Sequence, residues 1–349
     1  MEKLVNPQKI LLTGIDGYIG VQLAQVLVKN GFKVTGLDTG YYRNAWLYNG
    51  VTEIFPSVVT KDIREVTVED LKEFDAVVHL AELSNDPLGQ NDPELTFDIN
   101  HRGTMNLANC AKEAGVKKFV YFSSCSVYGA SDNIANENSP VNPLTAYAQS
   151  KIMNEEALMK LADDNFSPTI MRNATAYGAS PRMRFDLVVN NLAGLAWTTG
   201  EIKMDSDGTP WRPLVHILDI SKAVVCILNA KKSVVHNEIF NIGDTKANYQ
   251  IKQIAEIIGK TFTDCKISFN SNSSDKRNYR VNFDKINSTL PGFVCDWTVE
   301  MAVKELEDIF KNINMTEETF KSKNFTRLKQ VDWLKETGQI DGKLFWRNK

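Results

Sequence analysis

The sequence predicts an α/β fold in which helices cover both faces of a doubly wound parallel sheet. Three observations lead to this prediction. Short apolar runs alternate with amphipathic segments throughout the first half of the chain. The first apolar run leads through a glycine-rich turn directly into a helical pattern. The composition, with 43% apolar and 24% charged residues, is that of a globular protein with a sizeable core.

The elements of the first half follow one another as strand, helix, strand. The apolar runs predict buried strands at 9–13, 32–37, 76–80 and 119–122. The helical patterns lie at 18–29, 94–114 and 146–163. Strands that alternate with helices favour a parallel sheet, and the right-handed crossover rule then favours a Rossmann-type layout.

The second half of the chain is less regular. Its patterns predict a helix at 185–197, a strand–helix unit at 214–228, a strand at 239–242, and then helix, strand and helix between 247 and 312. This interleaving favours a smaller second lobe built from non-contiguous segments. Trp333, Phe345 and Trp346 follow in a C-terminal segment, and such aromatic residues predict that the segment packs against the protein.

Charge and composition argue against several classes of protein. A formal net charge of -3 gives no electrostatic reason to bind nucleic acid or an anionic membrane. No run approaches the roughly 18 apolar residues of a membrane span, and the N-terminus lacks the apolar stretch of a signal peptide. The five cysteines form no CxxC pair and the four histidines lack metal-ligand spacing. We therefore expect a cytoplasmic protein with free thiols and no metal site.

A glycine-rich turn is the clearest candidate for a phosphate site. Gly14, Gly17 and Gly20 follow a predicted strand and open a predicted helix, which is the context that a dinucleotide fingerprint requires. The turn lets backbone N–H groups approach a diphosphate, and the helix N-terminus adds a favourable partial charge. We expect Tyr18 and Ile19, between these glycines, to contact the cofactor as well. The alternative is an ordinary strand–turn–helix connection.

The next predicted strand ends in an acidic residue. Asp38 lies 18 residues after Gly20. A carboxylate at this place accepts hydrogen bonds from the adenosine ribose and repels a 2′-phosphate, so it favours NAD over NADP. Alternatively, Asp38 only begins a turn with Thr39 and Gly40.

A tyrosine and a lysine supply candidate acid–base chemistry. Tyr147 and Lys151 are four residues apart on a predicted helix, which places them on one face. A phenol has a reference pKa of about 10, and a neighbouring ammonium stabilises its ionised form. The pair can therefore take a hydroxyl proton while a hydride leaves the same carbon. Ser124, at the end of the strand predicted at 119–122, is placed to hydrogen-bond the reacting oxygen.

Together these motifs resemble the extended short-chain dehydrogenase/reductase family, in its sugar-nucleotide epimerase/dehydratase branch. The resemblance runs from about Lys9 to about Asn312 and includes the glycine turn and the Tyr147/Lys151 pair. It also includes Asp62-Ile63-Arg64, His79-Leu80-Ala81, Asn100 with Gly103-Thr104, the stretch Ser123-Ser124-Cys125-Ser126-Val127-Tyr128-Gly129, and the segment from Arg212 to Asp219.

The resemblance implies roles for individual residues. Ser124, Tyr147 and Lys151 form the catalytic set. The implied cofactor contacts, besides the glycine turn, Asp38, Tyr147 and Lys151, are Asp62 and Ile63 at the adenine, Leu80 and Ala81 along the cofactor, Glu82, Asn100 in support of the catalytic network, and Ala174. The implied substrate contacts are Ser84, Ser124, Cys125, Ser126, Asn173, Thr175, Asn191 and Arg212, with Asn191 and Arg212 at the substrate diphosphate. Further candidates to hold an anion of the substrate are the basic residues Arg182, Arg184, Arg277 and Arg280, each with surface placement as the alternative. Alternatively, Asn191 is an exposed helix residue and Arg212 forms a surface ion pair.

The resemblance also implies the division of the chain. Residues 1–179 plus 214–244 form the NAD-binding domain, residues 180–213 plus 245–312 form the substrate-binding lobe, and residues 313–349 form a C-terminal extension. It further implies a homodimer in which the helices at 94–114 and 146–163 pair as a four-helix bundle.

Four positions depart from the family pattern. Dehydratases of this branch carry an Asp-Glu pair directly after the catalytic hydroxyl residue, whereas this chain has Cys125 and Ser126, which disfavours sugar dehydration. Cys125 is either a reactive thiol or a small buried side chain. Glu82 replaces a small residue near the expected nicotinamide end. Thr175 stands where many relatives have a phosphate-contacting asparagine.

The preferred hypothesis is an NAD-dependent nucleotide-sugar epimerase, acting at C4, that oxidises the sugar transiently and returns the hydride to the other face. The alternative from the same residues is a sugar or nucleotide-sugar dehydrogenase or 4-ketoreductase with net redox turnover. A third class, a non-catalytic NAD-sensing or scaffold protein, is disfavoured by the intact Ser124, Tyr147 and Lys151.

Overall fold

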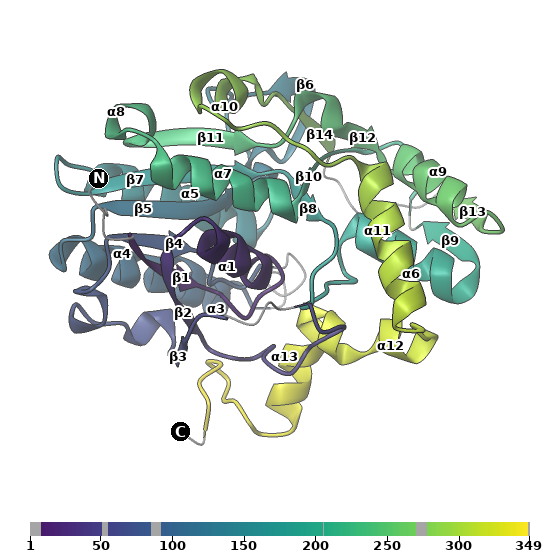
Figure 1. Cartoon of the computed structure of the whole chain (residues 1–349), viewed down its shortest axis with the longest axis horizontal. Helices are drawn as coiled ribbons and strands as arrows, with labels where there is room; N and C mark the ends of the chain where they lie inside the picture. Colours follow the sequence, from purple (N-terminus) through teal and green to yellow (C-terminus); the bar gives the residue numbers. More distant parts are fainter. Residues whose placement is uncertain (1–7, 51–54, 85–91, 205, 270–277, 348–349) are drawn as a thin grey trace, which may run out of the picture.

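The computed structural model describes residues 8–50, 55–84, 92–204, 206–269 and 278–347. Its centre is a sheet of seven strands in which every neighbouring pair is parallel (Figure 1). From edge to edge the strands are β3 (Val58–Thr60), β2 (Lys33–Asp38), β1 (Lys9–Thr13), β4 (Ala76–His79), β5 (Lys118–Ser124), β7 (Ser167–Asn173) and β11 (Glu238–Ile242). The strand order reverses between β1 and β4, so the predicted doubly wound fold is confirmed.

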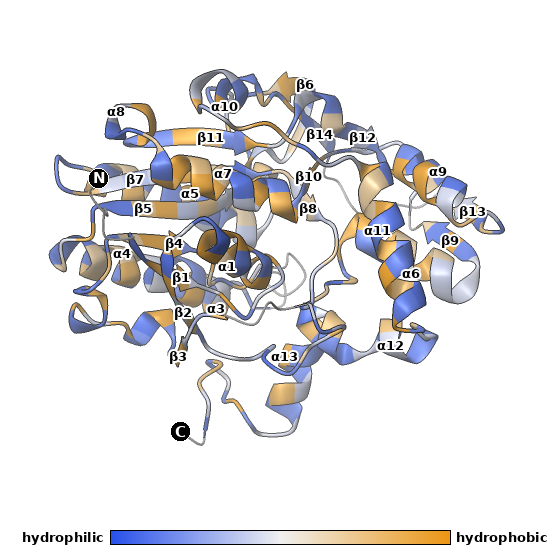
Figure 2. Cartoon of the chain, in the orientation of Figure 1, coloured by the Kyte–Doolittle hydropathy of each residue, from blue (hydrophilic) through white to orange (hydrophobic). Residues whose placement is uncertain are grey.

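Alternation along the strands builds a core on each face of this sheet. Ile10 and Leu12 of β1 pack with α1 (Gly20–Lys29) and α7 (Ile217–Asn229) on one face. Leu11 packs with α4 (Thr104–Glu113) and α5 (Ala146–Leu161) on the other. The sheet strands are mainly orange in Figure 2, as expected for a parallel sheet buried on both faces.

The predicted helix at 94–114 is helical but contains an irregular turn. It consists of α3 (Pro93–Phe97), a π-helical turn η3 (Asp98–Gly103) and α4. In that turn the Asn100 carboxamide accepts a hydrogen bond from the Leu83 N–H and donates one to the Leu83 carbonyl. Through these two hydrogen bonds the Asn100 side chain fixes the chain segment that follows β4.

The second lobe has its own apolar core. Its helices are α6 (Val188–Thr199), α9 (Ile251–Thr261) and α11 (Val299–Asn312). The smaller sheets are formed by β8 (Thr175–Tyr177), β10 (Trp211–His216) and β12 (Asn248–Gln250), by β9 (Glu201–Met204) with β13 (Lys266–Phe269), and by β6 (Ala130–Ala135) with β14 (Asn278–Val281). The exact domain boundaries given above stay a prediction.

Short elements complete the chain. They are α8 (Lys232–Val235), α10 (Asp284–Thr289), η1 (Ile63–Glu65), η2 (Glu69–Leu71), η4 (Cys125–Tyr128) and η5 (Thr245–Ala247). The C-terminal segment forms α12 (Glu317–Lys321), η6 (Lys323–Phe325) and α13 (Arg327–Glu336), and it packs back on the protein as its aromatic residues predict (Figure 1).

Candidate active site

A cavity of about 280 Å³ opens at the carboxyl ends of the central strands. Most of the residues expected at the cofactor or substrate line it. They are Gly14, Gly17, Tyr18, Ile19, Gly20, Asp38, Asp62, Ile63, Leu80, Ala81, Glu82, Ser84, Ser124, Ser126, Tyr147, Lys151, Asn173, Ala174 and Thr175. Segments far apart in the sequence thus meet at one cavity.

The glycine turn leaves no room for side chains. Gly14 has a φ of +77°, and its N–H donates to the Leu37 carbonyl over 2.8 Å. A Cβ on Gly20 would lie 2.1 Å from the Gly14 carbonyl oxygen. Glycine at both positions therefore lets helix α1 start directly against the turn, which is the cradle that a dinucleotide diphosphate needs.

Gly20→Ala tests this cradle. Because the added Cβ meets backbone, we expect a loss of about 3 kcal/mol in unfolding free energy together with weaker NAD binding. Gly342→Ala is the control, since a Cβ there meets open space. Thermal unfolding and NAD titration of the two variants measure the difference, and equal behaviour of both variants would contradict the tight turn.

Asp38 is buried at the end of β2. Its carboxylate accepts hydrogen bonds from the Asp16 N–H at 3.0 Å and from the Gly40 N–H at 2.7 Å. Burial, and then the charge of Asp16, raise the pKa of Asp38 to about 6. Asp38 therefore both makes the turn contact with Gly40 and lines the cavity. With a pKa of about 6, its side chain is ionised at neutral pH.

Asp38→Asn tests cofactor choice. At pH 8 the ionised carboxylate repels the 2′-phosphate of NADP, and at pH 5, below its pKa of about 6, Asp38 is neutral. We expect Asp38→Asn to bind NADP about tenfold more tightly than the native protein at pH 8, and nearly equally at pH 5. Calorimetric titrations at both pH values measure this, and an identical ratio at pH 5 and pH 8 would argue against the carboxylate as the discriminating group.

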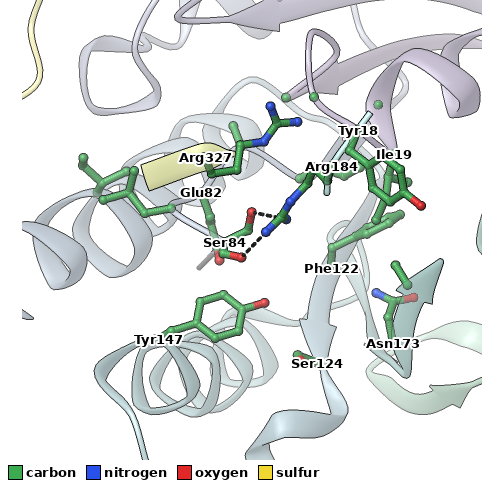
Figure 3. Close-up of a pocket in the computed structure, with 18 of the residues that line it drawn as sticks. Tyr18, Ile19, Glu82, Ser84, Phe122, Ser124, Tyr147, Asn173, Arg184 and Arg327 are labelled. Carbon is green, nitrogen blue, oxygen red and sulfur yellow. Dashed lines mark hydrogen bonds between the residues drawn. The ribbon is translucent and has the colours of Figure 1, made fainter. Parts of the chain in front are cut away.

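Tyr147, Lys151 and Ser124 meet at the other end of the cavity. Thr145 caps α5 by accepting a hydrogen bond from the Ala148 N–H, so Tyr147 lies in the first turn of the helix. The Lys151 ammonium is buried, 5.3 Å from the centre of the Tyr147 ring. Figure 3 shows the Tyr147 phenol pointing toward the space that Ser124 and Asn173 also face.

A buried carboxylate accompanies this lysine. The Glu82 side chain is 2% exposed and forms an ion pair with Lys151, whose ammonium also donates to the Phe122 carbonyl. The other Glu82 oxygen accepts a hydrogen bond from the Tyr121 hydroxyl at 2.8 Å. Burial raises the pKa of Glu82, against the lowering effect of Lys151. Glu82, expected as a cofactor contact at a position that departs from the family pattern, is thus the counter-ion of the lysine.

Several buried polar atoms in the cavity wall have no hydrogen-bond partner among the described residues. Two of them are the Ser126 hydroxyl and the Asn173 carboxamide oxygen. Asn173 is held in place because its amide nitrogen donates to the Ser123 and Met171 carbonyls. Polar atoms fixed in this way are available to a ligand in the cavity.

Five of the residues expected to contact the cofactor or the substrate do not line the cavity. Asn100 is used by the Leu83 backbone, as described above. The Cys125 thiol lies in the core, donates to the Arg172 carbonyl, and has its pKa raised well above the usual range by burial, which removes the reactive-thiol interpretation. Cys125 is therefore the small buried side chain of the other interpretation.

The other three residues form an ion pair or hydrogen bonds within the protein. Arg182 pairs with Asp16 at 3.4 Å, Asn191 donates to the Phe185 carbonyl at 2.8 Å, and Arg212 is buried and donates to the Trp211 carbonyl at 2.8 Å. The alternatives were an exposed helix residue for Asn191 and a surface ion pair for Arg212. In the structure Arg212 is buried, and the Asn191 side chain is hydrogen-bonded to the backbone. Arg277 lies outside the described residues.

Other residues that line the cavity stand outside the sequence motifs described above. Arg184 is buried, pairs with Asp186 at 2.9 Å, and donates to the Ser84 hydroxyl (Figure 3). Tyr41 and Tyr42 line the cavity close to Asp38 in the sequence, and Arg327 reaches the cavity from α13. Only Arg184 had been a candidate, as one of several basic residues able to hold an anion.

The described residues contain no cluster of histidine, cysteine or carboxylate side chains that could hold a metal ion. Among the helices that the structure describes, none has the length and apolar character needed to cross a bilayer.

Comparison with known proteins places the chain among related enzymes. The putative UDP-glucose 4-epimerase of Methanocaldococcus jannaschii is 27% identical over 88% of this chain and 100% of its own length. The UDP-glucose 4-epimerase of Corynebacterium glutamicum is 30% identical over 71% of this chain and 79% of its own length.

Solved structures show the same fold. The NAD-dependent NDP-hexosamine 5,6-dehydratase TunA superposes with a TM-score of 0.78 at 24% identity, over 87% of this chain and 98% of that chain. The UDP-glucuronic acid 4-epimerase of Bacillus cereus, solved with UDP-glucuronic acid and NAD, gives a TM-score of 0.75 at 24% identity, over 88% of this chain and 100% of that chain. The family model of the NAD-dependent epimerases and dehydratases matches residues 10–243. The chain therefore belongs to the NAD-dependent epimerase/dehydratase family.

Proposed function

We propose that this protein is an NAD-dependent nucleotide-sugar 4-epimerase. The observation that carries the proposal is the convergence of Tyr147, Lys151 and Ser124 on one end of a cavity whose other end is a dinucleotide cradle. The 4-epimerases among the relatives, two of which are named above, support the assignment.

The cavity residues divide the work of the reaction. Bound NAD, held by the glycine turn and Asp38, supplies a hydride acceptor and donor. Tyr147 removes the proton of the C4 hydroxyl and later returns a proton to the oxygen. Ser124 hydrogen-bonds that oxygen, and the Ser126 hydroxyl and the Asn173 carbonyl oxygen supply further contacts to the sugar nucleotide.

The cavity argues against the dehydratase branch of the family. Elimination of water needs a carboxylic acid beside the reacting carbon. Within the described part of the chain, the carboxylates lining the cavity are Asp38 and Asp62 on the cofactor side and Glu82, which is committed to Lys151. Cys125, at the position of the dehydratase aspartate, points into the core.

The experiment is incubation with UDP-glucose, UDP-galactose, UDP-glucuronate and their N-acetylhexosamine counterparts. We expect at least one pair of C4 epimers to interconvert, seen as new anomeric signals by NMR, with no net absorbance change at 340 nm. Steady NADH production with exchangeable NAD would instead identify the net dehydrogenase of the alternative hypothesis, or its ketoreductase running in the direction that oxidises the sugar.

The assembly and location are part of the same proposal. We propose a cytoplasmic homodimer that pairs α4 and α5 of each subunit and does not bind nucleic acid. Met153, 40% exposed on α5, is an apolar side chain that such a pairing would cover. Light scattering showing only monomer at working concentrations would reject the dimer.

A further inference from the structure

The C-terminal segment, residues 313–347 of the described chain, supplies part of the cavity wall. Arg327, the first residue of α13, lines the same cavity as the glycine turn. This segment lies beyond residue 243, where the family match ends. A feature of this chain outside the matched region therefore reaches the cofactor side of the site.

The segment is fixed to the loop that follows β2. Its apolar residues Val331, Leu334 and Leu344 pack with Tyr41 and Ile99. The Gln330 amide donates to the Tyr41 carbonyl at 3.0 Å, and the Trp346 indole donates to the Thr39 carbonyl at 2.7 Å. Since Thr39 and Tyr41 lie within three residues of Asp38, these contacts hold the C-terminal segment beside the end of the cavity where Asp38 lies.

The Arg327 guanidinium is buried without a directly bonded anion: Asp186 and Asp38 act on its charge, but neither accepts a hydrogen bond from its terminal nitrogens. The residue is 4% exposed, and its guanidinium carbon lies 3.9 Å from the centre of the Tyr42 ring. Its two terminal nitrogens have no hydrogen-bond partner among the described residues. Burial lowers the pKa of Arg327 to about 10, so the group is still charged at neutral pH. A buried cation in this state calls for an anionic ligand.

The other cations of the cavity wall already have carboxylate partners. Lys61 pairs with Asp70, Lys151 with Glu82, and Arg184 with Asp186. In Figure 3 the Arg327 guanidinium lies toward the end of the cavity where Tyr18 and Ile19 are, away from Tyr147 and Ser124. In this view Arg327 lies on the side of the glycine turn, and its two terminal nitrogens are uncommitted within the described structure.

We propose that Arg327 binds the diphosphate of the NAD held in this cavity, so that the C-terminal segment closes the cofactor site. The glycine turn offers neutral N–H groups, and the guanidinium adds a positive charge with forked donors suited to phosphate oxygens. Release of the cofactor then requires this ion contact to break. The inference rests on the family's use of NAD and not on the reaction at C4.

The test is calorimetric titration of cofactor-depleted protein with NAD, ADP, adenosine and UDP. In Arg327→Gln we expect NAD and ADP to bind about 10- to 100-fold more weakly, while adenosine, which lacks phosphate, and UDP bind as in the native protein. Arg327→Lys keeps the charge and should recover part of the loss. Lys329→Gln removes an exposed charge from the same helix and should bind all four ligands normally.

Three results would overturn the proposal. Unchanged NAD and ADP binding in Arg327→Gln would remove the contact. Weaker binding of UDP but not of ADP would assign the guanidinium to the substrate diphosphate. An equal loss for adenosine, in both Arg327→Gln and Arg327→Lys, would give Arg327 a purely structural role. None of these readouts depends on turnover, so failure of the epimerase assignment would be seen separately.

Discussion

Replacing Tyr147 with phenylalanine is expected to lower turnover about 10³-fold while leaving NAD bound. The phenol is the group placed to take the sugar hydroxyl proton, and phenylalanine keeps the ring but removes that function. The ring also packs near the Lys151 ammonium, so its retention preserves the local structure. The initial rate of C4 epimerisation and the NAD content after denaturation measure the two halves of this expectation.

Tyr249→Phe is the matched control. It removes a phenol hydroxyl from β12, outside the cavity wall, and should leave the rate near that of the native protein. If Tyr147→Phe keeps a rate within a few-fold of Tyr249→Phe, Tyr147 is not the acid–base group and the mechanism has to be assigned to other residues.

The second large effect is expected from Glu82→Gln. The change leaves the buried Lys151 ammonium without its counter-ion, which costs about 3 kcal/mol in unfolding free energy. In the active site it removes a negative charge and frees the positive charge beside Tyr147, and both changes favour the ionised phenol. The acidic limb of the pH–rate profile should therefore move to lower pH by about one unit or more.

Glu155→Gln separates stability from catalysis. Glu155, on α5, is buried like Glu82 and pairs with Arg172 at 2.6 Å, but it does not line the cavity. We expect a similar loss of stability without a shift in the pH–rate profile. Equal profiles for Glu82→Gln and Glu155→Gln would show that Glu82 does not tune the Tyr147–Lys151 pair.

Local patterns were enough to predict that the glycine turn and the Tyr147–Lys151 pair belong to a site, and the structure places both in the wall of one cavity. Gly14 and Gly20 follow a strand and open a helix, and Tyr147 and Lys151 share one helical face, so both depend on residues close in the sequence. The orientation of Cys125 was harder to predict because β5 continues to Ser124 and the chain then turns through η4, which places the thiol in the core.

Long-range packing explains the residues that the sequence did not reveal. Arg327 reaches the cavity only because α13 packs on the loop after β2, and the Glu82–Lys151 pair needs β4 and α5 to meet across the sheet end. Arg182 and Asn191 have suitable side chains for a diphosphate, but tertiary contacts with Asp16 and the Phe185 carbonyl occupy them. Such competition between partners cannot be read from spacing.

The central claim is that the hydrogen on C4 leaves as a hydride, remains in the site, and returns to the same carbon. A UDP-sugar carrying deuterium at C4, turned over in ordinary water, tests this directly. The account predicts that the C4 epimer formed retains the deuterium at C4, as measured by mass spectrometry and NMR. Replacement of the deuterium by hydrogen from solvent would contradict hydride transfer and with it the role assigned to Tyr147.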